Sequence, residues 1–155
     1  MAISRGPGTE IIRTACFEAI AGVSSKNLII GVQHHIYTVL SIIVTPAGAV
    51  AGSKFSCHIL GYDSFGGATG QIINVFITPI TEQKTFVWND KFSFNGYEPV
   101  NFGTGGITSA PLSAADQQDA IADQGSSVAQ KLQCYTLQSG DSVDVTITYI
   151  DQNNE

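Results

Sequence analysis

The chain has 155 residues, of which 43% are hydrophobic and 13% are charged, against roughly 25% charged residues in typical globular chains. Its net charge at pH 7 is −6, and its 7 basic residues are scattered. This argues against a nucleic-acid partner, which needs a phosphate-neutralising patch. The length suits one domain with its own core. So few charges favour a subunit that covers part of its surface in an assembly.

The opening residues, MAISRGPGTE, contain no apolar segment, so we expect no signal peptide. The longest apolar run, Ile36–Val44, is too short to span a bilayer, and we expect no membrane partner. We expect residues 1–9 to form an N-terminal arm and residues 10–155 to form a single β-sandwich domain.

Segments rich in β-branched and aromatic residues alternate with clusters of Gly, Pro, Asn, Asp and Ser along the chain. This spacing predicts an all-β fold, an antiparallel β-sandwich of jelly-roll or immunoglobulin-like type. The predicted strands are Glu10–Ile20, Leu28–Val32, His35–Thr45, Lys54–Tyr62, Gln71–Thr78, Thr85–Trp88, Lys91–Asn95, Gln130–Leu137 and Ser142–Asp151.

The strand His35–Thr45 is apolar on both faces, which predicts a central position in its sheet. One face would meet the opposite sheet. The other would meet either a helix or loop of the same chain, or a second subunit.

Two hairpins are predicted from turn residues. Asn89-Asp90 lies between two arms of alternating apolar residues, and both residue types tolerate the left-handed backbone of a two-residue turn. Ser139–Asp141 would turn the chain into the last strand, where one face is expected to be buried and the other wet. The expected inward residues of that strand are Val143, Val145, Ile147 and Tyr149.

The segment from Asn95 to Ala129 departs from this rhythm, since it is rich in Gly, Pro, Ser and Gln. Its only predicted helix is a short surface helix over Ser113–Asp123, with Ser113 as the N-cap. A connection of this length in a compact domain is usually functional or disordered.

Candidate interface residues come from the N-terminal arm and from this long connection. Tyr97 and Phe102 stand beside Pro99 and Gly103, and interfaces favour such aromatic side chains. A place in the core or a carbohydrate-stacking role would give the same pattern. The candidate partner-interface residues are Ile3, Arg5, Pro7, Tyr97, Pro99, Phe102 and Ile107.

We find no pattern that predicts catalysis, a metal site or a cofactor. Adjacent strand residues point to opposite faces, so His34 and His35 would not both bind one metal ion, and we expect satisfied core or edge histidines. Gly61–Gly66 lacks the first glycine of a G-x-S-x-G nucleophile elbow, because Tyr62 stands in its place. We therefore expect a protein that is not an enzyme and has no small-molecule substrate.

The three cysteines, Cys16, Cys57 and Cys134, are widely spaced and include no C-x-x-C pair. Cys16 and Cys57 lie in apolar strand-like stretches, where a free cysteine behaves as a small hydrophobe. We expect all three to be reduced core residues of a protein assembled in a cytoplasm.

Two segments, GVQHHIYTVLSIIV (Gly31–Val44) and TFVWNDKFSFNGYEP (Thr85–Pro99), resemble small virion structural proteins of tailed bacteriophages, particularly marine and cyanobacterial phages. The closing SGDSVDVTITYID (Ser139–Asp151) resembles the end of phage β-sandwich modules. The resemblance implies a sandwich on the particle exterior and carries no catalytic residues. Its partners would be the major capsid protein, other copies of itself, or both, and such proteins often act as trimers.

The leading hypothesis is therefore a virion protein, assembled in the host cytoplasm, that decorates and cements a phage capsid. A cement protein binds the assembled lattice and not its free parts, so it adds stability by mass action. The alternative is a tail or fibre component that binds a host-surface glycan.

Overall fold

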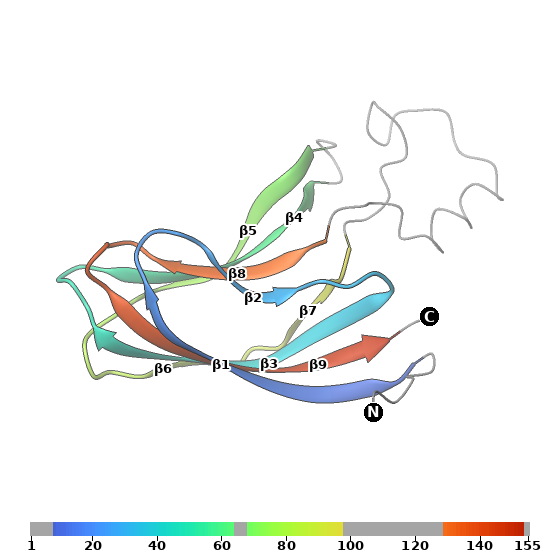
Figure 1. The fold of residues 1–155 in the computed structure, drawn as a ribbon, viewed down its shortest axis with the longest axis horizontal. Helices are drawn as coiled ribbons and strands as arrows, with labels where there is room; N and C mark the ends of the chain where they lie inside the picture. The colour runs from blue at the N-terminus through green and yellow to red at the C-terminus, as the bar shows by residue number, and fades with distance from the viewer. Residues whose placement is uncertain (1–7, 64–67, 98–128, 154–155) are drawn as a thin grey trace.

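Two antiparallel sheets packed face to face make up the computed structural model, which describes residues 8–63, 68–97 and 129–153 (Figure 1). The predicted antiparallel sandwich is confirmed, and each predicted strand is present with its ends shifted by a few residues. The strands are β1 (Glu10–Ala21), β2 (Lys26–Ile30), β3 (His35–Gly48), β4 (Lys54–Asp63), β5 (Ala68–Pro79), β6 (Phe86–Trp88), β7 (Phe92–Asn95), β8 (Lys131–Thr136) and β9 (Ser142–Asn153).

The strand order places early and late parts of the chain beside each other. The first sheet, sheet A, has the order β1-β9-β3, and both β6 and β7 pair with the far side of β3. The second, sheet B, has the order β2-β8-β4-β5. The pairs β1·β9, β2·β8, β3·β6/β7 and β4·β5 are therefore nested, as in one long hairpin rolled up until its ends meet.

The predicted hairpin at Asn89-Asp90 is wrong. β6 pairs with Ile42–Val44 and β7 with Ile36–Val39, so the two segments form one interrupted strand along β3. The physical reason is the length of β3, whose edge offers partners to both segments at once. The indole Nε1 of Trp88 donates to the carbonyl oxygen of Asp90, 3.0 Å away, across the interruption. Phe86 and Trp88 share the inward face, because both rings pack on Phe76.

The second predicted hairpin, at Ser139–Asp141, is also wrong, because β8 lies in sheet B and β9 in sheet A. The connection crosses between the sheets and is fixed by Asp141, which is 1% exposed. Its carboxylate accepts hydrogen bonds from the backbone N–H of Val50 (2.9 Å), the N–H of Gln138 (3.1 Å) and the hydroxyl of Ser53. A buried carboxylate thus satisfies backbone donors that the crossing leaves without sheet partners.

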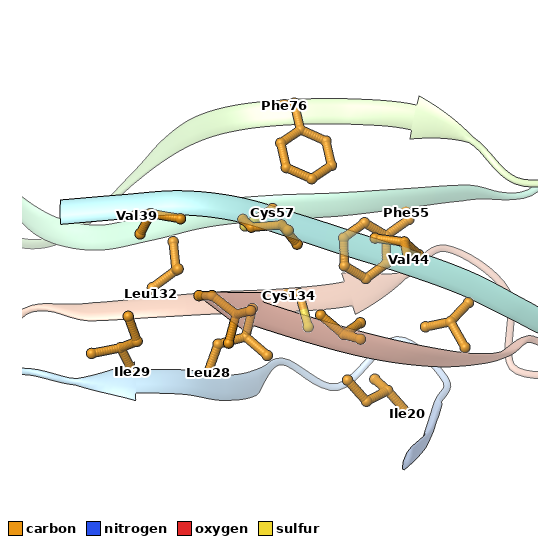
Figure 2. Close-up of a cluster of buried hydrophobic side chains, with 14 of the residues drawn as sticks. Ile20, Leu28, Ile29, Val39, Val44, Phe55, Cys57, Phe76, Leu132 and Cys134 are labelled. Atoms are coloured by element: carbon orange, nitrogen blue, oxygen red, sulfur yellow. The ribbon is translucent and has the colours of Figure 1, made fainter. Parts of the chain in front are cut away.

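The core lies between the sheets and is built from the inward-facing half of each strand (Figure 2). Val143, Val145 and Ile147 are fully buried, which confirms the predicted inward face of the last strand. Phe55 and Leu132 project into the same core from sheet B. Full burial of each large apolar side chain contributes about 1.5–3 kcal/mol.

Two of the three cysteines are core residues, as predicted. Cys57 and Cys134 face each other across β4 and β8 and are fully buried free thiols. Burial raises the pKa of Cys134 to about 12. Burial also raises the pKa of Cys57, and the neighbouring Cys134 raises it further. The prediction is wrong for Cys16, which is exposed on edge strand β1.

A pair of glycines joins the two sheets where β2 ends and β7 ends. Gly31 donates its N–H to the carbonyl of Gln130 (2.8 Å), Gln130 donates to Gly96 (2.9 Å), and Gly96 donates to His35 (2.8 Å). A Cβ atom on Gly31 would collide with the backbone of Gly96, and one on Gly96 with the backbone of Val32. Glycine is therefore required on both sides of this close approach.

Three expectations fall partly or wholly outside the described residues: the helix over Ser113–Asp123, the rest of the long connection, and most of the N-terminal arm. The last two residues of the arm are described, and they extend the pairing of β1 with β9. Gly8 donates its N–H to the carbonyl of Asn153, and Asn153 donates to Thr9 (3.0 Å). No helix long and apolar enough to cross a membrane occurs among the described residues.

We predict that Gly96→Ala lowers the free energy of unfolding by about 2–3 kcal/mol, because the added methyl group must displace backbone that is hydrogen-bonded on both sides. Gly48→Ala is the matched control, since a Cβ atom there meets no atom within 4 Å. Urea denaturation followed by circular dichroism measures both variants. Equal stability of the two variants would contradict this reading of the junction.

Candidate functional site

Among the predicted interface residues, Tyr97 is the one that lies within the described part of the chain. Ile3, Arg5, Pro7, Pro99, Phe102 and Ile107 lie outside the described residues. Tyr97 is half-buried and forms an isolated bridge with Ala129. Its carbonyl oxygen accepts a hydrogen bond from the Nε2 of Gln130, 2.9 Å away. The backbone of Tyr97 thus belongs to the junction between the sheets, and a role for its ring at an interface stays a prediction.

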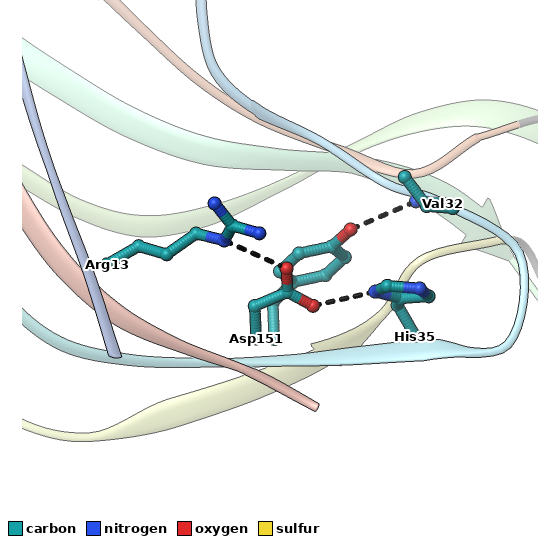
Figure 3. Close-up of polar contacts among 5 residues, drawn as sticks. Arg13, Val32, His35 and Asp151 are labelled. Atoms are coloured by element: carbon teal, nitrogen blue, oxygen red, sulfur yellow. Dashed lines mark hydrogen bonds and ion pairs between the residues drawn. The ribbon is translucent and has the colours of Figure 1, made fainter. Parts of the chain in front are cut away.

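The polar cluster around Asp151 is the main concentration of charge on an inward face among the described residues (Figure 3). Asp151 lies near the end of β9, and its side chain is 7% exposed. The Nε of Arg13 on β1 donates to its Oδ2 at 3.0 Å, and the Nδ1 of His35 on β3 lies 2.6 Å from its Oδ1. One carboxylate therefore ties three adjacent strands of sheet A together, where Coulomb attraction is stronger than in water.

Tyr37 belongs to the same cluster. Its hydroxyl oxygen accepts a hydrogen bond from the backbone N–H of Val32 at 3.2 Å, and its ring stacks on Phe94. Burial, with a further contribution from the Asp151 carboxylate, raises the pKa of Tyr37 to about 12, although the hydrogen bond from Val32 acts in the other direction. The phenol is therefore protonated at neutral pH and acts as a hydrogen-bonding group.

The histidines are placed largely as the sequence predicted. His35 is a partly buried histidine at the start of the central strand β3 and is satisfied by Asp151, and His34 lies in the preceding turn with a φ of 62°. His58 is fully buried, and its Nε2 lies 3.2 Å from the Oε1 of Gln133. Its Nδ1 has no hydrogen-bond partner in the described part of the chain, and neither has the Oγ of Ser56 on the same face of β4. No three His, Cys, Asp or Glu residues in the described ranges form a group that could hold a metal ion.

The middle of the outward face of sheet A carries no charged side chain, and Glu10 and Asp144 lie in the rows that bound it at either end. Its register sets Ile12, Ile150, Thr38 and Ser93 in one row across the strands, and Cys16, Thr146, Ile43 and Val87 in another. We call this surface the outer A face. Its residues are Ile12, Thr14, Cys16, Ile36, Thr38, Ser41, Ile43, Val87, Ser93, Thr146, Thr148 and Ile150.

Hydroxyl groups on the outer A face bond to one another across strands. Thr14 and Thr148 are joined at 3.3 Å, and Thr38 and Ser93 at 2.8 Å. Such pairs lie in the plane of the sheet and use hydrogen-bonding capacity that would otherwise bind water. Since no charge needs to be desolvated and these hydroxyls keep their partners, the outer A face can be covered at little cost.

The sequence analysis missed both the Asp151 cluster and the outer A face. Arg13, His35 and Asp151 come together only through strand pairing across most of the chain. A signal for the outer A face was present, because the polar positions of the last strand are threonines with few charges among them. That signal predicts an uncharged surface only once the neighbouring strands are aligned, because their outward positions are then seen to lack charge as well.

Comparisons with known proteins give fold likenesses at low similarity. No family model matches the chain, and no curated protein matches it. A solved Bacillus endospore appendage, from a family of disulfide-linked pili, is 10% identical with a TM-score of 0.44, covering 100% of this chain and 97% of that one. A chain of the T13 infectious bursal disease virus particle is 10% identical with a TM-score of 0.42. A chain of the T=1 particles derived from that virus is 11% identical, also with a TM-score of 0.42.

This chain spans 39% and 38% of the two viral chains. Because all three TM-scores are below 0.5, these likenesses carry no argument about function.

We predict that Tyr37 makes stability fall at alkaline pH. Below its ordinary pKa of 10.0, the phenol is protonated in both the folded and the unfolded chain. Above that pH the unfolded chain loses the proton first, so the stabilisation declines until the pH passes the folded-state pKa of about 12.

The stability difference between the parent and Tyr37→Phe should therefore fall by about 1.4 kcal/mol from about pH 8 to about pH 11. Other titrating groups are common to both chains and cancel. Urea denaturation at the two pH values measures it, and an unchanged difference would show that Tyr37 ionises normally.

Proposed function

We propose that this chain is a structural protein of a viral particle, which decorates and cements a capsid through protein–protein contacts. The observation that carries the proposal is the outer A face, whose three central rows run across the strands of sheet A without a charged side chain. The cores of protein interfaces are depleted of charged residues, and obligate interfaces are the most apolar. The overall charged fraction of 13% is consistent with a surface that is covered in its working state.

The strand pairing favours the jelly-roll form of the sandwich. In an immunoglobulin fold, consecutive strands pair repeatedly within a sheet, as A with B, D with E and F with G. Here, among the described residues, only the β4·β5 ladder joins two strands that follow each other in the chain. The other ladders join strands that lie further apart in the sequence, on either side of this hairpin. Double-sheet jelly rolls occur in viral capsid domains and in lectin domains, so the fold agrees with the proposal but does not by itself decide it.

The Asp151 cluster supports a structural role more than a chemical one. Its ion pair with Arg13 and its hydrogen bond with His35 run along the sheet between strands β1, β9 and β3, and the Tyr37 phenol beside it is protonated at neutral pH. An arrangement of this kind holds the ends of three strands in register. A particle protein needs such rigidity because it must present a fixed surface to a lattice.

Thr148→Lys tests the proposal, because it places a charge in the middle of the outer A face. Thr81→Lys makes the same chemical change in the exposed connection between β5 and β6 and serves as the matched control. Each variant is supplied in place of the parent chain during particle production. Quantitative mass spectrometry of purified particles then measures copies per particle, and antibody labelling in electron microscopy shows their position.

We expect many copies of the parent and of Thr81→Lys over the particle shell, and at least a tenfold loss for Thr148→Lys. Circular dichroism of the free chains checks that both variants fold. Equal incorporation of the two variants would contradict the role of the outer A face. A few copies confined to a tail would favour the alternative, a tail or fibre component that binds a host glycan.

A further inference from the structure

The edges of the two sheets differ in how well they are protected against pairing with another chain. Edge strands present a row of N–H and C=O groups outward, and proteins commonly block them with charges, bulges or short strands. In sheet A, β1 carries Glu10, Arg13 and Glu18, and it is bulged between Phe17 and Ile20. The opposite edge of sheet A consists of β6 and β7, which have 3 and 4 residues.

In sheet B, β2 is protected in the same ways, since it has 5 residues and begins with Lys26. β5 is different. It has 12 residues, none of them charged, and it is the last strand of its sheet within the described part of the chain. Large apolar side chains are exposed along it: Ile72 is 60% exposed, Ile73 is 52% exposed and Ile77 is 51% exposed.

These side chains lie on both faces of β5. Successive residues of a strand point to opposite faces, so Ile72 and Ile73 leave apolar surface uncovered above and below the sheet at the same point. Burial against the opposite sheet would explain only one of the two. A further strand placed beside β5 would contact both, because its own side chains alternate in the same way.

A bulge at Val75 divides β5 into two parts. Cys57 on β4 pairs with Phe76 and the next residue, His58, pairs with Asn74, so Val75 has no partner on β4. On one side of the bulge, Phe76 is covered by Phe86 (5.4 Å between ring centroids) and Trp88 (4.9 Å). On the other side lie Ile72, Ile73 and Asn74, which are all exposed. Figure 1 shows β4 and β5 extending away from sheet A towards this end.

We propose that β5 pairs through Ile72–Asn74 with β5 of a second copy, antiparallel across a twofold axis, so that the two B sheets become one continuous sheet. Antiparallel pairing about a twofold axis sets the same segment against itself, and a strand without charge meets no like-charge repulsion in doing so. The other three edges carry charges or are short, so β5 is the edge of this chain that a second β5 fits best.

This inference rests on the proposed function and deepens it. It names a surface through which copies of the chain bind each other. The β5 edge belongs to sheet B, whereas the outer A face belongs to sheet A. A dimer formed through β5 would therefore leave both outer A faces available for a capsid. The two contacts can be tested separately.

Ile73→Lys tests the pairing, because it places a charge on the proposed edge. Val23→Lys is the matched control, since Val23 is 62% exposed in the connection between β1 and β2. Sedimentation equilibrium of the purified full chain should give a dimer for the parent and for Val23→Lys. Ile73→Lys should be monomeric, with at least a tenfold weaker dimerisation constant and an unchanged circular dichroism spectrum.

A second measurement keeps the inference testable if Ile73→Lys does not fold. In a Cys16→Ser background, Ile72→Cys places a thiol near the proposed axis, and oxidation by copper phenanthroline should give a disulfide-linked dimer. Val23→Cys in the same background should give none. A monomeric parent chain, or crosslinking that is equal at the two positions, would overturn the inference.

The outcomes also separate the two proposals. A monomeric chain that still labels particle shells would overturn the β5 pairing and leave the proposed function standing. A β5 dimer in a chain that never labels particles would do the reverse.

Discussion

Backbone pairing between strands far apart in the chain is the constraint on which this structure depends. The ladders β4·β5, β3·β6/β7, β2·β8 and β1·β9 each close around the one before, and β3·β9 and β4·β8 join them into two sheets, so the core is complete only when both ends of the chain are in place. Asp151 lies near the close of the outermost ladder and binds Arg13 and His35. The buried carboxylate therefore lies where the first and last strands of the chain pair. Removing Asp151 would take away the contact that Arg13 and His35 share, and with it a side-chain link between β1, β9 and β3.

The scarcity of charged residues has consequences in three parts of the molecule. Within the core, buried polar groups such as Asp141 are satisfied by several backbone and hydroxyl donors. On the outer A face, hydroxyls pair with each other and few sites bind water strongly. At the β5 edge, no charge prevents another strand from approaching. Together these features are the reason that both proposals concern assembly.

The strands could be predicted from the sequence because alternation of apolar and polar residues is a local pattern. The pairing of strands could not. Asn89-Asp90 has the residues of a tight turn, yet the chain continues straight there because β3 is long enough to pair on both sides of it. Likewise Arg13, His35 and Asp151 carry no common motif, and only the register of β1, β9 and β3 brings them together. The apolar neighbours of Cys16 predict a core position, but its side chain lies on the outward face of β1.

Hydrogen–deuterium exchange of the full chain at low and high protein concentration tests most directly whether its uncharged surfaces are covered by other copies. Edge-strand amides exchange quickly when they face water and slowly when they pair. Peptides that contain Ile72–Asn74 should exchange at least tenfold more slowly in the concentrated sample, while peptides around Val23 should not change. Equal exchange of the β5 peptides at both concentrations would contradict this.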